Sequence, residues 1–484
     1  MASNSDLVQQ LWGLCNILRD DGITYHQYVN ELSYLLFLKM AHETGADAEL
    51  PRGFGWTDLA GRTGADQFDF YRKQLVTLGT DENPQIRAIF ANPTSLLRQP
   101  SSLNILVAKI DEFDWYRARQ EGLGDLYEGL LQKNASEKKS GAGQYFTPRP
   151  LIDCMVAVMK PSVDDVIQDP AAGTGGFLVA AQRYILENGR PETWTRDQRQ
   201  KFEEGTFFGM EHVQDTHRLA LMNLMLHGIQ SRPDGAGIRL GDTLSPVGAA
   251  LPRATLFLTN PPFGTKSGGG VPTRKDLPFP TSNKQFCFLQ HIYLGLMPGG
   301  RAAVVLPDNV LFEGNIGKQI RVDLMNKCNL HTILRLPTGI FYAQGVNTNV
   351  LFFTRGSSEI ANTQKVWVYD LRTGMPQYGK RKQLIRAAFN RFEEEFGDDP
   401  WGSSDALALR RESTDGGPFR CYSREEIAAR NESLDLSWSR GNTRDVDIID
   451  RDPVELAHEA LEELECAMEH LRGILGALGE EDEQ

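Results

Sequence analysis

The sequence has few cysteines, and no two of them form a closely spaced pair. Six cysteines are scattered over 484 residues without a CxxC motif. Neither a zinc knuckle nor a disulfide framework is therefore indicated, and no metal site is predicted. Single cysteines fit a reducing, cytoplasmic setting. No apolar run approaches the roughly 20 residues that cross a bilayer, so no membrane partner is expected.

Positive charge is also scarce. The chain has 51 Lys and Arg residues against 64 Asp and Glu residues, which gives a formal net charge of -13. Binding to a nucleic-acid backbone depends on Lys and Arg side chains that neutralise phosphates. A chain of this charge is not expected to hold DNA alone, although a local basic groove or a basic partner subunit stays open. No helix-turn-helix or zinc finger is present.

The pattern along the chain predicts three regions. Residues 1–135 place apolar side chains at helical spacing, most clearly over 24–43. Residues 136–375 begin with a Gly-rich connector and then alternate short apolar strands with helices, a pattern typical of an α/β fold with a doubly wound sheet. Residues 376–484 are polar and charged and end in one long helix.

The first α/β unit contains a glycine-rich turn, "DPAAGTGGF", which begins at Asp169. Gly173, Gly175 and Gly176 permit a tight turn between a strand and a helix. The dinucleotide fingerprint is broken because its third glycine position is Leu178, which disfavours a nicotinamide oxidoreductase. A phosphate-binding P-loop is absent too, because no Gly-Lys pair is followed by Ser or Thr.

Three successive strands are each predicted to end in a carboxylate. These residues are Asp169, Glu211 and Asp242. In a doubly wound sheet, ligands bind outside the carboxyl ends of the strands. The three side chains would therefore surround one nucleoside-like ligand that has a cationic or hydroxyl-rich part, although Glu211 considered alone is more typical of a surface carboxylate.

A second motif ends a later strand. The stretch "LTNPPFGTK" follows an apolar run and contains Asn260, Pro261, Pro262 and Phe263. Proline cannot donate to a strand ladder, so the strand must stop there. A plain strand stop that packs its phenylalanine into the core is the structural alternative, but it leaves the double proline unexplained.

These two motifs together resemble the amino-methyltransferases that modify exocyclic nitrogens of DNA bases. "GQYFTPRP", residues 143–150, is similar to the motif that precedes the cofactor turn in one order-class of adenine-N6 enzymes. The combination resembles the modification subunit of type I restriction-modification systems over residues 1–375. It implies a helical N-terminal domain, a Rossmann-like S-adenosylmethionine-dependent methyltransferase domain and a C-terminal helical tail.

The resemblance assigns the cofactor-binding residues. S-adenosylmethionine is the implied methyl donor, with Glu211 on its ribose hydroxyls and Asp242 on its adenine amino group. The residues that would hold its methionine part are Asp169, Gly173, Thr174, Gly175 and Gly176. The residues of the upstream motif that would line the cofactor are Gln144, Tyr145, Phe146, Thr147, Pro148 and Arg149.

The resemblance also assigns the chemistry of the second motif. The lone pair of an adenine N6 amine is delocalised into the ring, which makes the amine a poor nucleophile. The Asn260 side-chain oxygen and the Pro261 carbonyl would accept its two N–H groups, while Pro261 and Pro262 fix the carbonyl direction. Phe263 would stack on the flipped-out base. Neither a metal nor a covalent enzyme intermediate is required.

The last helix, predicted over 453–478, has the 3-4 apolar spacing of a coiled coil. It is predicted to dock a partner subunit, and packing on this chain's own core is the alternative.

The resemblance implies double-stranded DNA with a flipped adenine, a specificity subunit and a second copy of the chain as partners. Whether a nuclease-translocase subunit joins them stays open.

Two other functions fit parts of the pattern. A stand-alone adenine DNA methyltransferase could recognise its own site through the tail after residue 375. The other function is that of a structural subunit with a degenerate site, and the intact proline motif and glycine turn argue against it.

The Gly- and Pro-rich segment 264–284 is locally basic and is predicted to be a mobile flap, with plain disorder as the alternative.

Overall fold

The computed structural model divides the chain into two compact units. One comprises Met1–Glu412 and Pro418–Leu436, and the other comprises Ser413–Gly417 and Ser437–Gln484. The structure describes residues 4–14, 17, 25–93, 95–115, 127, 129–130, 147–231, 235–264, 272–341, 347–373, 375, 378, 384–413 and 417–436. The predicted docking helix, 453–478, lies outside them and stays a prediction. The first unit contains all the elements below.

The described elements up to residue 115 are helical, as the spacing of apolar residues predicts. The predicted helix over 24–43 is observed as α3. Apolar side chains from these helices, such as Leu35, Tyr71 and Leu106, are fully buried in one core. The α-helices are α1 (Asn4–Gly13), α3 (Tyr25–Thr44), α4 (Trp56–Ala60), α5 (Gly64–Leu78), α6 (Pro84–Ile89) and α7 (Pro100–Asp111).

A nine-stranded sheet follows, in the order β3-β2-β1-β4-β5-β7-β6-β8-β9. Neighbouring strands from β3 to β5 are parallel, β7 runs antiparallel between β5 and β6, and β9 runs antiparallel to β8. The strands are β1 (Ile167–Asp169), β2 (Phe207–Glu211), β3 (Gly237–Leu240), β4 (Ala254–Thr259), β5 (Leu296–Pro307), β6 (Cys328–Arg335), β7 (Thr348–Arg355), β8 (Lys365–Asp370) and β9 (Phe419–Ser423). The predicted α/β fold with a doubly wound sheet is confirmed.

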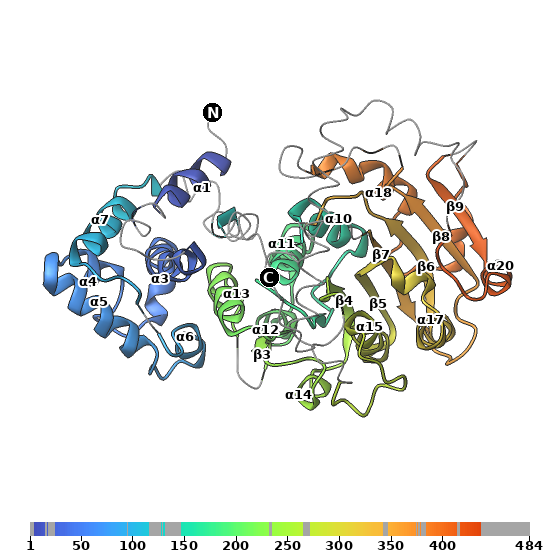
Figure 1. Ribbon diagram of the computed structural model, residues 1–484, viewed down its shortest axis with the longest axis horizontal. Helices are drawn as coiled ribbons and strands as arrows, with labels where there is room; N and C mark the ends of the chain where they lie inside the picture. Colours follow the sequence, from blue (N-terminus) through green and yellow to red (C-terminus); the bar gives the residue numbers. More distant parts are fainter. Residues whose placement is uncertain are drawn as a thin grey trace, which may run out of the picture. The chain divides into compact units, whose positions relative to one another are not determined.

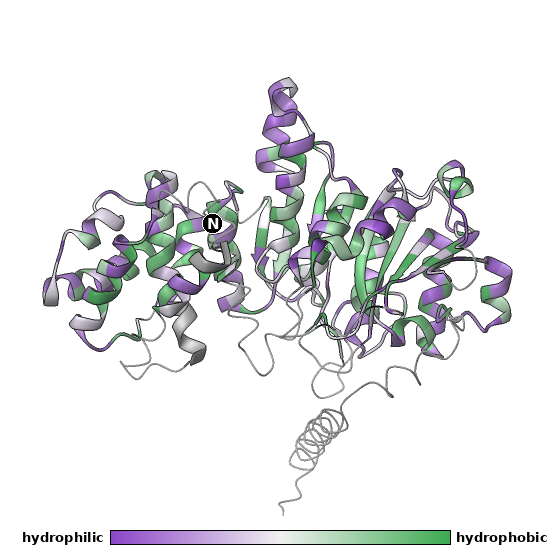
Figure 2. Ribbon diagram, turned by 90° about the horizontal axis from the view of Figure 1, so that it is seen from above, coloured by the Kyte–Doolittle hydropathy of each residue, from purple (hydrophilic) through white to green (hydrophobic). Residues whose placement is uncertain are grey.

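Helices cover both faces of this sheet (Figure 1). α10, α11 and α18 form one layer, whereas α15 and α17 pack on each other and on β5 and β6. Apolar residues concentrate along the strands and on the helix faces directed toward them (Figure 2). The α-helices are α10 (Arg149–Met159), α11 (Gly176–Asn188), α12 (Arg196–Glu204), α13 (Gln214–Leu226), α14 (Pro246–Ala249), α15 (Lys284–Gly295), α16 (Asn309–Phe312), α17 (Ile316–Lys327), α18 (Asn390–Phe396), α19 (Ser404–Leu409) and α20 (Arg424–Ala429).

Helix α13 belongs to two hydrophobic cores. Leu219 and Met222 are buried in the core of the N-terminal helices. Ala220 and Leu224, on the opposite side of α13, are buried in the core around the sheet. The Tyr127 hydroxyl also lies 3.2 Å from the Met222 sulfur. A single helix thus buries apolar side chains on both of its sides.

The sheet extends beyond the region predicted for catalysis. β9 lies in the part of the sequence after residue 375, and its Phe419 side chain is fully buried in the core around the sheet. The boundaries of the three predicted regions stay predictions. Within the described part of the chain, none of the helices has both the length and the apolarity needed to cross a bilayer.

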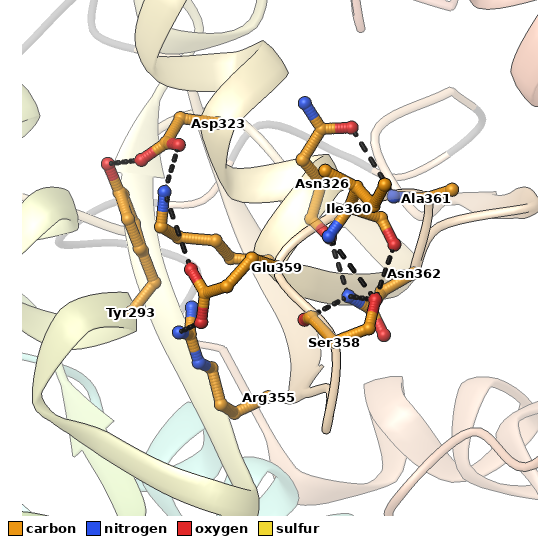
Figure 3. Close-up of polar contacts among 10 residues, drawn as sticks. Tyr293, Asp323, Asn326, Arg355, Ser358, Glu359, Ile360, Ala361 and Asn362 are labelled. Atoms are coloured by element: carbon orange, nitrogen blue, oxygen red, sulfur yellow. Dashed lines mark hydrogen bonds and ion pairs between the residues drawn. The ribbon is translucent and has the colours of Figure 1, made fainter.

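A polar cluster joins α15, α17 and the end of β7 (Figure 3). The Tyr293 hydroxyl donates to Asp323 Oδ2 at 2.7 Å, and Lys327 binds the other oxygen of the same carboxylate. Arg355 pairs with Glu359 in the connection that follows β7. Burial raises the pKa of Tyr293, and the Asp323 carboxylate raises it further. The cluster holds α15 and α17 together near their C-terminal ends.

A buried ion pair fixes the start of β1. Arg301 on β5 binds both oxygens of Asp165, each at 3.0 Å, and donates to the Met159 carbonyl at 2.8 Å. The Arg301 and Asp165 side chains are only 3% and 8% exposed. Burial alone would raise the pKa of Asp165, but the hydrogen bond and charge of Arg301 lower it overall. The pair therefore connects β5 with the chain that leads from α10 into β1.

We expect Arg301→Met to destabilise the chain by about 3–5 kcal/mol, because it leaves the Asp165 carboxylate buried without its counter-ion. Urea denaturation followed by tryptophan fluorescence measures the loss. The control is Arg391→Met, since Arg391 is 63% exposed and pairs with Glu395 one turn along α18. The control should change stability by less than about 1 kcal/mol. Equal losses in the two variants would contradict this account.

Candidate active site

Four parallel strands bring the predicted site residues to one edge of the sheet. Asp169 and Glu211 are the last residues of β1 and β2, and Asn260 directly follows β4. Asp242 lies two residues after β3. β1 pairs with both β2 and β4, and the chain order reverses at β1. This reversal is the switch point at which doubly wound sheets bind ligands.

The glycine turn after β1 has the conformation that its residues predict. Gly173 and Gly175 have φ angles of +54° and +84°, which non-glycine residues rarely adopt. A Cβ at Gly175 would lie 2.6 Å from a methyl carbon of Leu224, whereas a Cβ at Gly173 would meet no atom within 4 Å. Gly175 therefore allows close packing on α13, and Gly173 borders open space.

Bonds from neighbouring elements hold this turn. The Gly173 N–H donates to Glu211 Oε2 at 3.0 Å, and the Thr174 carbonyl accepts from the Asn223 side chain on α13 at 3.0 Å. α11 begins at Gly176. The predicted turn residues are thus fixed against β2 and α13, and one side of the turn is open to a ligand.

Asp169 is the most buried of the strand-end carboxylates, with 1% of its surface exposed. Its Oδ1 accepts from the Thr259 hydroxyl at 2.6 Å and from the Ala171 N–H at 3.1 Å. Burial raises the pKa of Asp169 to about 7, although these two hydrogen bonds oppose the shift, and the charge of Glu211 adds to it. The buried carboxyl group therefore keeps its proton to a higher pH than an exposed aspartate does.

The other two carboxylates are partly buried. Burial raises the pKa of Glu211, and the N–H groups of Val213 and Gly173 oppose that shift. Asp242 Oδ1 accepts from the Leu244 N–H at 2.8 Å. Both residues hold the backbone of the loops in which they lie, so Glu211 is more than a surface carboxylate.

We expect Asp169 to make stability depend on pH. An unfolded aspartate loses its proton near pH 4, whereas Asp169 in the folded chain keeps it up to about pH 7. Protonated Asp169 therefore stabilises the folded chain fully below about pH 4, and this stabilisation is lost as the pH rises to about 7. Between pH 5 and pH 8 the free energy of unfolding of the wild type should fall by roughly 2–3 kcal/mol more than that of Asp169→Asn. Urea denaturation at both pH values tests this, and equal losses in the two proteins would exclude it.

Asn260 connects the two sequence motifs that are furthest apart in the site. Its side chain is 6% exposed, and its Nδ2 lies 2.9 Å from the hydroxyl oxygen of Thr147, which is itself buried. Thr147 belongs to the "GQYFTPRP" motif and precedes Pro148, the N-cap of α10. This bond fixes the rotation of the Asn260 amide and therefore the direction of its oxygen.

For the rest of the upstream motif, the described residues do not test the predicted cofactor contacts. Gln144, Tyr145 and Phe146 lie outside the described residues. The Arg149 side chain donates to Asp153 on the same helix at 3.2 Å. The cofactor contacts proposed for these four residues, and for Pro148, therefore stay predictions. Among the described residues of this motif, Thr147 bonds directly to the site through Asn260.

The proline motif is packed on its inner side. Pro261 is buried, Pro262 is partly buried, and Phe263 is partly buried against the core around the sheet. The N–H of Gly264 donates to Gln285 Oε1 at 3.0 Å. Both ends of the tetrapeptide are therefore held, one by β4 and the other by α15.

The described part of the segment 264–284, which is residues 264 and 272–284, is anchored, and this differs from the predicted mobile flap. Arg274 donates to the Thr243 carbonyl at 3.2 Å and to His291 at 2.6 Å. Leu277 is buried, and the Phe279 backbone bonds twice to the Gln290 side chain on α15. These contacts come from residues distant in sequence, so local composition could not indicate them.

Sequence patterns did not identify Thr259 and Gln285, which bond directly to Asp169 and Gly264. One sequence feature could have indicated Gln285. It is a polar residue within the apolar stretch "KQFCFLQ", which belongs to a helix that proves to be buried. Thr259 left none, since threonine is common in strands.

Comparisons with known proteins agree with this geometry. A family model described as N-6 DNA methylase matches residues 118–444. The chain belongs to the N-6 DNA methylase family. Within it, the chain is 48% identical to the methylase subunit of the type I restriction enzyme EcoKI from Escherichia coli strain K12, over 99% of this chain and 97% of that protein. It is a modification subunit of the type I kind.

Solved structures extend the similarity to the fold. The crystal structure of the EcoKI M protein is 44% identical and matches with a TM-score of 0.56, covering 99% of this chain and 97% of that one. A structure from a study of complex assembly and conformational transition in a type I system is 25% identical. It matches with a TM-score of 0.72 over the full length of both chains.

Proposed function

We propose that this chain transfers a methyl group from S-adenosylmethionine to the N6 amino group of adenine in DNA, as the modification subunit of a type I restriction-modification complex. The observation that carries the proposal is the position of Asn260. It lies directly after β4, next to the glycine turn of β1, with its amide held by Thr147. The ends of these two neighbouring strands would bring a target amine close to a methyl donor.

The residues at this edge fit the cofactor. S-adenosylmethionine has a cationic amino-acid end, a ribose diol and an adenine, and three carboxylates lie at or just after the ends of the adjacent strands. Asp169 and the turn from Gly173 to Gly176 would hold the methionine part, Glu211 the ribose hydroxyls and Asp242 the adenine amino group. The open space beside Gly173 supports this assignment. When bound, the cofactor supplies a methyl group on a sulfonium, which is activated for transfer.

The chain's own residues would prepare the acceptor. The Asn260 side-chain oxygen and the Pro261 carbonyl accept the two N–H groups of the target adenine and favour a tetrahedral nitrogen, so that its lone pair is released from the ring. Phe263 stacks on the flipped base. Catalysis is then mainly a matter of positioning and of excluding water.

The partners follow from charge and relationship. A chain of net charge -13 neutralises few phosphates, so a separate specificity subunit reads and holds the double-stranded DNA. A second copy of this chain and a nuclease-translocase subunit complete the proposed assembly, which works in the cytoplasm. The helix over 453–478 is the proposed docking element for a partner.

One experiment separates this function from its rivals. Radiolabelled methyl transfer to duplex DNA is measured for the purified chain, with and without its specificity subunit. We expect activity only in the complex. Activity of the chain alone would favour the stand-alone methyltransferase, and binding of neither cofactor nor DNA by the complex would favour a structural subunit.

A further inference from the structure

The residue after the proline motif is held through both of its backbone polar atoms. The N–H of Gly264 donates to Gln285 Oε1 at 3.0 Å, and the Gly264 carbonyl accepts from the Lys284 N–H at 2.9 Å. Both partners lie in the first turn of α15. Gly264 has a φ angle of +98°, a conformation in which an L side chain is strained. The chain thus leaves the motif in one fixed direction, set by the start of α15.

Gln285 is itself oriented by further side chains. It is 4% exposed, and its Nε2 donates to Asn309 Oδ1 at 3.3 Å. The Asn309 amide nitrogen donates to Glu313 Oε2 at 2.9 Å, and Asn283 donates to the same oxygen at 3.3 Å. Since both ends of the Gln285 amide are bonded, its carbonyl oxygen can face only Gly264.

The other side of α16 is held by a buried arginine. Arg321 on α17 is 1% exposed and donates to the carbonyls of Val310 at 3.0 Å and Glu313 at 2.8 Å. Its Nε also donates to the Glu432 carbonyl at 2.8 Å. Burial lowers the pKa of Arg321 to about 10, so it stays charged at neutral pH. Helix α16, which begins at Asn309, is therefore fixed from two sides.

We propose that Gln285 is a positioning residue for methyl transfer, which acts through Gly264 on the motif from Asn260 to Phe263. The two prolines fix their own φ angles, so the freedom that remains lies at the ends of the motif. β4 and Thr147 hold the first end. Gln285, oriented by Asn309 and Glu313, holds the second and so sets the direction of the Pro261 carbonyl. This inference rests on the proposed function.

The test uses Gln285→Met in the complete modification complex, because methionine has a similar length but neither accepts nor donates at that position. We expect kcat to fall about 10- to 100-fold, as a displacement of about 1 Å can cost 10²-fold in rate. The KM for DNA and the Kd for S-adenosylmethionine should stay within about threefold, because the proposed cofactor residues at the ends of β1, β2 and β3 are unchanged.

Two further variants distinguish positioning from general stability. Gln285→Glu keeps an acceptor for the Gly264 N–H but loses the bond to Asn309 Oδ1, so it should recover part of the lost kcat. Tyr293→Phe removes the bond to Asp323 at the other end of the same helix (Figure 3) and should lower the melting temperature without lowering kcat. If Gln285→Met does not fold, Asn309→Leu takes its place, and a kcat about 3- to 10-fold lower is expected.

The outcomes separate this inference from the function beneath it. An inactive wild-type complex would overturn the proposed function itself. An active wild type with inactive Asn260→Ala, together with a Gln285→Met variant within twofold of the wild-type kcat, would overturn only the role of Gln285. The role of Gln285 would also be overturned if Tyr293→Phe lost as much kcat as Gln285→Met. If Asn309→Leu has to replace Gln285→Met, an unchanged kcat in Asn309→Leu would overturn that role.

Discussion

Asn260→Ala in the complete complex should lose methyl transfer by about 10²- to 10³-fold while it keeps its affinity for S-adenosylmethionine. The alanine removes the acceptor that would face the target amine, and removing one such preorganised group typically costs 10²- to 10³-fold in kcat. The cofactor residues on β1, β2 and β3 are unchanged, so the Kd should stay within about threefold. Radiolabelled methyl transfer to duplex DNA and calorimetric binding of the cofactor provide the two measurements.

A matched control for this variant is Asn329→Ala. Asn329 lies near the start of β6, at the opposite edge of the sheet, and donates to the Gly402 carbonyl at 2.9 Å. Its loss should reduce stability slightly and leave methyl transfer intact. Undiminished turnover by Asn260→Ala would refute the role assigned to this side chain, whatever the control shows.

Gly173→Asp should weaken binding of S-adenosylmethionine by at least about 100-fold, which corresponds to roughly 2.7 kcal/mol. The new side chain would enter the open space beside the turn and bring a second negative charge close to Glu211, which accepts from the Gly173 N–H. Aspartate tolerates positive φ angles better than most residues, so the backbone of the turn should persist. Calorimetric titration with the cofactor measures the change.

Gly228→Asp controls for backbone strain in this experiment. Gly228 has a φ angle of +73°, and an added Cβ would also meet open space, but the residue lies after the end of α13 rather than at the strand ends. Its affinity for the cofactor should stay within about threefold of the wild type. Similar losses in both variants would mean that strain, and not occupation of the site, explains the effect.

The sequence predicted most of the sheet because most of its strands are short apolar runs with clear signals at their ends, whereas β9, in the polar region after residue 375, was not predicted. Asp169 and Glu211 are the last residues of their strands, as expected, and α11 begins at Gly176. A residue at the end of a parallel strand has only one edge of the sheet available to it. The shared location of the site residues therefore follows from the sequence alone.

The contacts that orient these residues could not be deduced in this way. The bond between Asn260 and Thr147 spans 113 positions, and the bond between Asp169 and Thr259 spans 90. Such pairs depend on the register of strands and on the path of loops, and neither is encoded locally. For the same reason Arg274, in a segment of loop-like composition, proves to be anchored on a distant helix and loop.

Because α13 packs on both of its sides, a fragment without the N-terminal helices should have an exposed apolar surface. A fragment cut at residue 136 would keep Leu219, Met222 and Leu226 but lose the N-terminal side chains that surround them. Water would then reach an uncovered apolar stripe on a helix whose other side supports the glycine turn. Such a fragment should aggregate, so the first 115 residues serve the downstream fold as a permanent intramolecular cover as well as a region in their own right.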